Sequence, residues 1–510
     1  MDRTYLLGID IGTQGTKAVL LDNRGQAHGS AFRRSRLSQQ LPGVVEEDPE
    51  YQLKTVCQCI KACLAGAGVD PQRVAAIGID GQMAGIIGLG EDGRSITPYD
   101  SWLDTRCAPY ITRMQEQAGS EIIRKTGGPA SFNHGPKILW WKHERPEIYD
   151  RIAAFVQPSG YAAMRLCGMD ASQAYIDKSY LHFSGFANNA SGRWDESLCK
   201  RFGISPTKLP RIVDSHEVVG QMTPGAARRC GLLAGVPVVA GCGDTAASFL
   251  ACGATREGIC VDVAGTASVF AATTRQFKAD TRQRTLGWGQ SATPGLWHPY
   301  AYINGGGRNL EWFVAELAQQ RKSNCEKTLA YLNRLASRID PALDDPLFVP
   351  HLGGRVSPSQ PLLRGSWTGF TWSHTAAHLY RAVLEGVALE YCIYRDVLQL
   401  VNPELNIREV RITGGGEKST LWNQIKADAL AIPVVQINRQ EGAPLGAALL
   451  AGFGVGLFGK LEVTAARWIR RGEAVRPSRR LGAHYQTRLA RYTRLLQHLN
   501  QWAESQSQTR

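Results

Sequence analysis

The chain has 510 residues, of which 43% are hydrophobic and 20% are charged, and its formal net charge is +13. This length exceeds what one hydrophobic core usually serves, so we expect two domains with a ligand in the cleft between them. No apolar run approaches the ~20 residues that span a bilayer, and the N-terminus lacks the basic-then-apolar order of a signal peptide. We therefore expect a cytoplasmic protein with no membrane partner.

The positive charge raises the question of nucleic acid as a partner. The basic residues come as isolated pairs, such as Arg33-Arg34 and Arg228-Arg229, without an aromatic-laced basic stripe. A basic cleft would also attract an anionic nucleotide. The charge therefore does not require nucleic acid, and we do not expect it as a partner.

The chain opens with two short strands joined by a glycine-rich turn. Residues 5–11 are typical of a buried strand, residues 12–16 of a turn, and residues 17–21 of a second strand. A Walker-type loop or a dinucleotide fingerprint leads from a strand into a helix, so this strand–turn–strand unit is neither of them.

The composition of this turn suits a phosphate chain. Glycine lets backbone N–H groups approach closely, Thr13 and Thr16 supply hydroxyls, and Lys17 adds charge. Asp10, at the end of the first strand, is placed to hold Mg²⁺ through water molecules. Taken alone, the turn is better explained as an ordinary hairpin with glycine in its turn.

The same theme returns later in the chain. Residues 51–64 read as an amphipathic helix and residues 74–80 as a strand that ends in polar residues and glycine. Residues 258–268 then repeat the order of strand, Gly-Thr turn and strand, and residues 409–416 give a third version that ends in three glycines. Two related openings suggest an internal duplication, with one domain over residues 1–246 and a second over residues 247–510.

In this order the motifs resemble the FGGY carbohydrate kinases of the actin-like ATPase superfamily. The likeness covers nearly the whole chain and rests on Asp10 to Thr13 with Lys17, on Gly265 to Ser268, and on Gly414 to Ser419. It implies an α/β fold of two actin-like (ribonuclease H-like) domains, each a mixed sheet flanked by helices, with the active site in the interdomain cleft. It also implies an enzyme that transfers the γ-phosphoryl group of ATP, with Mg²⁺, to a hydroxyl of a small sugar or polyol. Homodimers are common in that family, although no interface can be read from the sequence.

The resemblance assigns residues to the cofactors. Those implied to bind ATP are Asp10, Gly12, Thr13, Gln14, Lys17, Gly265, Thr266, Gly414, Gly415, Gly416 and Ser419. Asp10 is the residue implied to hold the metal.

The general base is expected at Asp244. Phosphoryl transfer needs a carboxylate that accepts the proton of the attacking hydroxyl. The stretch Gly243 to Ala247 resembles the family's glycine-Asp-x-x-Ala signature. Asp before an alanine-rich stretch is also a standard helix start, and one residue can serve both purposes.

The acceptor residues are expected in two further motifs. Gln82 and Met83 resemble the xylulose-kinase stretch Gln-Met-His-Gly, but Ala84 stands where histidine is expected, which puts xylulose itself in doubt. The family's Trp-x-Asp-x-Arg pattern is present as Trp102, Asp104 and Arg106. Trp102 would offer an aromatic face to the sugar, with core packing as the alternative, and Asp244 would also contact the acceptor. Residues 42–49 resemble a loop found in several sugar kinases.

These motifs favour a ketopentose of the D-xylulose type as the acceptor. Ribulose, gluconate, glycerol and erythritol remain as alternatives within the family. A catalytically silent relative that binds nucleotide or sugar as a sensor is a different class, against which the retained Asp10, Thr13, Asp244 and Thr266 argue. An actin-like chaperone or motor ATPase would not need the motif that begins at Trp102.

Overall fold

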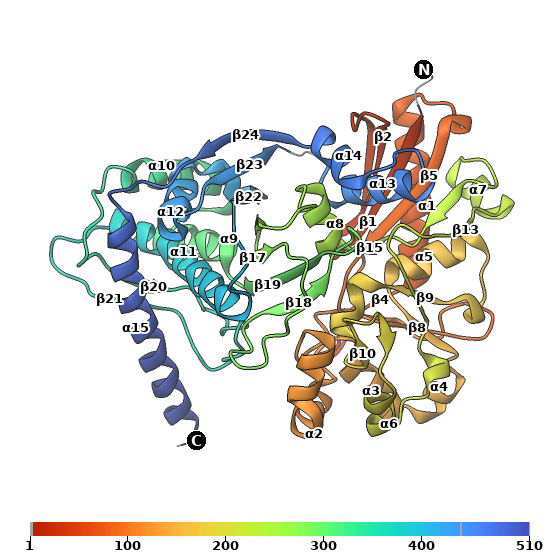
Figure 1. Ribbon diagram of the computed structural model, residues 1–510, viewed down its shortest axis with the longest axis horizontal. Coiled ribbons are helices and arrows are strands. Elements are labelled where there is room, and N and C mark those ends of the chain that lie inside the picture. The colour runs from red at the N-terminus through yellow and green to blue at the C-terminus, as the bar shows by residue number, and fades with distance from the viewer. Residues whose placement is uncertain (1–3, 439–440, 509–510) are drawn as a thin grey trace.

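The computed structural model describes residues 4–438 and 441–508, which form two lobes (Figure 1). The N-terminal lobe is built on a seven-stranded mixed sheet. Along the sheet the strands follow the order β13 (Val218–Gln221), β14 (Pro237–Val239), β5 (Val74–Gly81), β1 (Tyr5–Gly12), β2 (Gly15–Asp22) and β3 (Ala27–Arg34), with β15 (Cys242–Gly243) also paired to β5. The expected strand–turn–strand opening is therefore confirmed as the β1–β2 hairpin.

The C-terminal lobe has a second seven-stranded sheet. Its order is β18 (Gly287–Gln290), β19 (Trp297–Ile303), β17 (Ser268–Ala272), β16 (Ile259–Ala264), β22 (Glu409–Thr413), β23 (Val434–Asn438) and β24 (Arg470–Val475). From β19 to β24, successive pairings are antiparallel, antiparallel, parallel, parallel and antiparallel. The N-terminal sheet has the same succession from β3 to β13. The suggested duplication therefore appears in the topology of the two sheets.

Helices cover both sheets. The N-terminal sheet carries α1 (Pro49–Ala67) over β2 and β3, and the main core of the C-terminal lobe packs around α11 (Ala376–Val401) and α12 (Thr420–Leu430). The sequence sets the start and end of α1 clearly. Asp48 caps it by accepting from the Glu50 amide, Pro49 occupies its first turn, and Gly68 ends it in the left-handed region.

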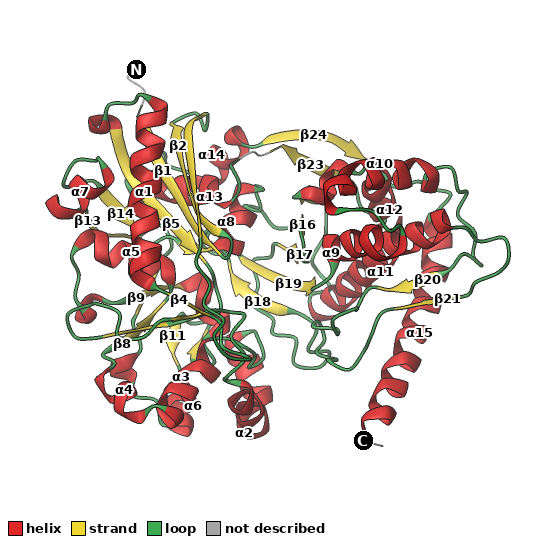
Figure 2. Ribbon diagram, turned by 180° about the vertical axis from the view of Figure 1, so that it is seen from behind, coloured by secondary structure: helices red, strands yellow, loops and turns green. Residues whose placement is uncertain are grey.

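Two helices lie between the sheets, α8 (Asp244–Ala251) and α13 (Ala443–Gly454). One apolar cluster joins both helices to the N-terminal sheet, and another joins α8 to β16 and β17 (Figures 1 and 2). The contact with α13 is so close that a Cβ at Gly8 would lie 1.8 Å from the carbonyl oxygen of Pro444, and one at Gly78 would lie 2.1 Å from that of Ala447. Glycine at these two strand positions is what allows the helix to reach the sheet.

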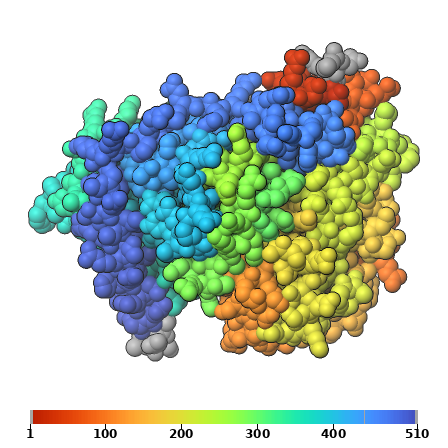
Figure 3. All heavy atoms as spheres, in the orientation of Figure 1, coloured from red at the N-terminus to blue at the C-terminus, as the bar shows by residue number. Residues whose placement is uncertain are grey.

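The C-terminal part of the chain therefore completes the N-terminal lobe. Figure 3 shows the blue surface around α13 and α14 (Leu461–Trp468) against the red N-terminal surface. The expected domain boundary at residue 246 falls inside α8. In the part of the chain that the structure describes, no helix is both long and apolar enough to cross a membrane.

Candidate active site

The first expected phosphate turn is the tip of the β1–β2 hairpin. Gly12 pairs with Gly15 across the turn, and Asp10 pairs with Lys17 one step back from Ile11 and Thr16. Gly15 has a φ of +156°, and a Cβ there would lie 2.1 Å from the carbonyl oxygen of Arg33 on β3. The Lys17 Nζ donates to the carbonyl oxygen of Glu441, just before α13, at 2.9 Å. The turn is thus fixed by glycine and tied to the helix between the lobes.

The expected base, Asp244, is the first residue of α8. Gly243 precedes it as the N-cap, and the Thr245 hydroxyl donates to Asp244 Oδ1 at 3.1 Å. The side chain is half-buried and makes no ion pair with any described residue. Burial, and secondarily the negative charge of Asp10, raise the pKa of Asp244 to about 7. A carboxyl group with this pKa can accept a proton at neutral pH and release it again.

A chain of hydrogen bonds joins the phosphate turn to the expected acceptor residues. The Trp102 indole Nε1 donates to Thr13 Oγ1 at 2.9 Å, and Thr13 Oγ1 donates to Gln82 Oε1 at 3.3 Å. Gln82 Nε2 then donates to Glu47 Oε1 at 2.9 Å. Gln82 and Glu47 are buried, whereas Trp102 keeps 45% of its surface exposed. Two predicted acceptor residues and one predicted phosphate residue therefore lie together.

Asp104 and Arg106 form a separate ionic cluster. Arg106 donates through Nε to Asp104 Oδ2 at 2.9 Å and through Nη2 to Glu46 Oε1 at 2.7 Å and Asp100 Oδ1 at 2.9 Å. Asp104 Oδ2 also accepts from the Val45 amide at 2.9 Å. The guanidinium lies 4.5 Å from the centre of the Trp140 ring. These contacts hold the loop after residue 100 against the loop before α1, and they occupy the charges that the sequence pattern assigned to sugar hydroxyls.

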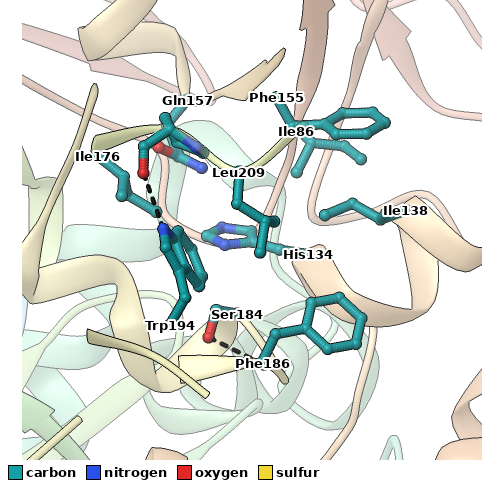
Figure 4. Close-up of a pocket in the computed structure, with 11 residues that line it drawn as sticks. Ile86, His134, Ile138, Phe155, Gln157, Ile176, Ser184, Phe186, Trp194 and Leu209 are labelled. Carbon is teal, nitrogen blue, oxygen red and sulfur yellow. Dashed lines mark hydrogen bonds between the residues drawn. The ribbon is translucent and has the colours of Figure 1, made fainter. Parts of the chain in front are cut away.

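Met83 lies between Gly243, which precedes Asp244, and a buried histidine. A Cβ at Gly243 would lie 2.5 Å from Met83 Cε, and His134 Nε2 donates to the Met83 carbonyl oxygen at 2.6 Å. Burial lowers the pKa of His134 to about 4, so the imidazole is neutral. Figure 4 shows His134 among the apolar side chains that line a small cavity. Its volume of about 10 Å³ is too small for a sugar, so the imidazole supports the Met83 loop from behind.

The second phosphate turn and the triple glycine pack against one another. A Cβ at Gly414 would lie 2.8 Å from the Ala264 carbonyl oxygen, and one at Gly416 would lie 2.6 Å from Ala264 Cβ. The Gly307 amide, at the start of α9 (Gly306–Trp312), donates to the Gly265 carbonyl oxygen at 2.8 Å. Gly415 has open space where a side chain would be. The glycines therefore let three backbone segments meet, with Thr266 on the turn between β16 and β17.

Ser419 has structural contacts of its own. Its hydroxyl accepts from the Trp422 amide at 3.2 Å, which caps α12, and donates to Asn333 Oδ1 at 3.0 Å. One helical turn beyond Trp422, Lys426 Nζ forms a fully buried ion pair with Asp262 Oδ2 at 2.5 Å. This pair joins α12, which follows the triple glycine, to β16, which precedes the second phosphate turn.

The described residues contain no metal site built from protein ligands alone. Among residues 4–438 and 441–508, no group of three or more His, Cys, Asp or Glu side chains could hold a metal ion. Mg²⁺ usually keeps several waters and binds one or two carboxylates together with substrate phosphates. A single carboxylate at Asp10, directly below the phosphate turn, fits that mode of binding.

Two family models match the chain, and they follow one another in the same order as the two lobes. The N-terminal domain of the FGGY family of carbohydrate kinases matches residues 5–251, and the C-terminal domain of that family matches residues 260–455. The chain belongs to the FGGY family of carbohydrate kinases. The family and the two-lobed α/β fold predicted from the sequence are confirmed, and the protein is an ATP-dependent carbohydrate kinase.

Individual relatives are similar over nearly their whole length. Xylulose kinase of Bacillus subtilis (strain 168) is 26% identical over 97% of this chain and 97% of its own. Gluconokinase of the same organism is 28% identical over 91% of this chain and 90% of its own. The crystal structure of xylulose kinase from Rhodospirillum rubrum superposes with a TM-score of 0.90 at 27% identity, covering 98% of this chain and 100% of that one.

Some residues of the site carry no role in the sequence motifs. The sequence places Glu47 only in a loop that resembles one found in several sugar kinases, whereas in the structure it accepts the hydrogen bond from Gln82. The run from Gly305 to Gly307, directly after β19, was a detectable signal because glycines that follow a strand mark close backbone approach. The Asp262–Lys426 pair had no such signal, since 164 positions separate its members.

Proposed function

We propose that this kinase transfers the γ-phosphoryl group of ATP to a hydroxyl of a neutral ketopentose of the D-xylulose type, with Asp244 as the general base. The observation that carries the proposal is the raised pKa of Asp244, about 7, at the N-terminus of α8 beside Asp10. The ionised carboxylate would take the proton of the attacking hydroxyl as the phosphoryl group transfers.

The nucleotide is proposed to lie across the lobes. The β1–β2 turn with Thr13 and Lys17 would hold its phosphates from one side and the turn at Thr266 from the other. Gly415, which is free of side-chain neighbours, would face the adenosine. Mg²⁺, held at Asp10 through water, would neutralise charge that develops on the transferring phosphates.

A neutral acceptor is supported by the charges around the acceptor residues. Two cations, Arg106 and Lys137, contact this part of the described chain. Arg106 binds three carboxylates, and Lys137 donates to the carbonyl oxygens of Ser101 and Asp104, at 2.9 Å each. Neither cation is available for the carboxylate of an aldonate. This disfavours gluconate, whereas xylulose kinases recur among the relatives.

The decisive experiment is an ATP-consumption assay with D-xylulose, L-xylulose, D-ribulose, L-ribulose, glycerol, erythritol and gluconate. We expect turnover to rise with a neutral ketopentose and not with gluconate. Turnover with gluconate alone would refute the neutral acceptor. Nucleotide binding without turnover on any member of the panel would favour the sensor.

A further inference from the structure

We infer that Glu47 is a positioning residue that orients Gln82, Thr13 and Trp102 for acceptor binding, an inference that rests on the proposed sugar-kinase function. Glu47 lies on the short strand β4 (Glu46–Glu47), which pairs with β7 (Tyr99–Asp100). Its neighbour Glu46 faces Arg106, but Glu47 turns into the protein and accepts from Gln82.

The buried carboxylate of Glu47 lowers the stability of the folded protein. The residue is only 3% exposed, and it makes no ion pair with any described residue. Burial raises its pKa above the ordinary value, which shows that desolvation outweighs the hydrogen bonds it accepts. A buried carboxylate without a cation lowers stability, so its presence beside the active site points to a functional reason.

The hydrogen-bond chemistry supplies that reason. An ionised carboxylate can only accept, so the Gln82 amide must turn its NH₂ group toward Glu47 and its oxygen toward Thr13. The Thr13 hydroxyl then donates to that oxygen and leaves its lone pairs to the Trp102 N–H. Every donor in this series of hydrogen bonds points toward Glu47. Glu47 therefore sets which group donates and which accepts in each hydrogen bond of the series.

This series of hydrogen bonds contacts both the expected acceptor residues and the phosphate turn. Trp102 is the exposed member, and its ring plane is fixed by the bond to Thr13. The Tyr99 side chain is fully buried. Burial raises the pKa of Tyr99, as do the charges of Glu47 and Asp244, so these two carboxylates lie near the same ring. Glu47 thus reaches the acceptor pocket and the phosphate turn from a single buried position.

The test compares Glu47→Met, Glu47→Gln and, as a control on the helix that follows, Glu50→Gln. Glu50 is half exposed and accepts from Tyr161. We expect Glu47→Met to raise the KM for the sugar at least tenfold and to leave the KM for ATP within about twofold. Its thermal stability should equal or exceed that of the wild type. Glu47→Gln keeps an oxygen that accepts from Gln82, so its sugar KM should stay within about threefold of the wild type.

Other outcomes overturn the assignment. An unchanged sugar KM in Glu47→Met would show that the chain does not need Glu47. A loss of stability with both KM values raised would show an ordinary structural residue. A wild-type enzyme that turns over ATP with no sugar would overturn the proposed function, and this assignment with it. An active wild type with an unaffected Glu47→Met variant overturns the assignment alone.

Discussion

Replacing Asp244 with Asn should strongly impair transfer and also make the protein more stable at alkaline pH. The carboxylate is the proposed base, and general-base catalysis contributes about 10²–10⁴-fold, so kcat should fall by that factor. The amide cannot ionise but keeps the size of the side chain, so nucleotide binding should be retained. In the wild type, kcat/KM should fall as the pH drops below about 7, because protonated Asp244 cannot accept the hydroxyl proton.

The stability change has a definite sign. The folded state holds the pKa of Asp244 at about 7 against an ordinary value of 3.8. Stability linked to this group is complete below pH ~4 and is lost as the pH rises through 7. The full shift corresponds to ~4 kcal/mol, and because the side chain is only half-buried, we expect solvent screening to leave ~1–3 kcal/mol. The neutral amide avoids this loss, so Asp244→Asn should gain stability at pH 8.5 and little at pH 4.5.

The assay is urea or thermal unfolding of wild type and variant at both pH values, alongside sugar-dependent ATP turnover. For a lobe of about 250 residues the gain corresponds to a shift in Tm of roughly 2–10 °C. Asp92→Asn is a suitable control, because it removes one negative charge from an exposed turn. Near-normal turnover in Asp244→Asn would refute the base. An equal gain at both pH values would refute the electrostatic reasoning.

Three further predictions concern residues that hold the backbone of the site in place. Gly15→Ala should weaken ATP binding in calorimetry and lower Tm, because the new Cβ would lie 2.1 Å from a carbonyl oxygen of β3. Lys426→Met should cost about 3–5 kcal/mol in urea unfolding by leaving Asp262 buried without its cation. It should raise the KM for ATP more than that for sugar, and the double variant with Asp262→Asn should recover stability. Ser179→Ala should lower kcat about tenfold and leave the KM for ATP unchanged. The reason is that the Ser179 hydroxyl accepts from the amide of Gly243, the residue before Asp244, at 2.9 Å. An unchanged kcat would contradict this.

Local features were well predicted because the sequence signals them locally. The hairpin β1–β2, the strands β5, β16 and β22 and the helix α1 all appear where apolar runs, caps and glycines predicted them. The family motifs also predicted the two-lobed fold and the kinase class. Each motif is a short run of residues, and the motifs follow one another along the chain in a fixed order.

Long-range packing could not be read in this way. Nothing local to residues 443–454 shows that α13 lies on the N-terminal sheet, because that contact depends on glycines more than 350 positions away, at Gly8 and Gly78. The pattern that begins at Trp102 shows charged residues but not their partners. The structure places Arg106 among three carboxylates, from β4, from β7 and from the segment that follows β7.

The carboxylates in and around the site differ in whether a cation accompanies them. Those around Arg106, like Asp262 beside Lys426, are paired, and the Glu46–Arg106 and Asp262–Lys426 pairs each join two distant backbone segments. Asp244 and Glu47 have no ion pair among the described residues, and burial raises the pKa of both. An unpaired buried charge opposes folding. A base needs that environment, because burial and neighbouring negative charge keep its pKa near neutral pH. Asp244 and Glu47 lie beside the phosphate turn, so their removal should stabilise the protein while impairing the reaction.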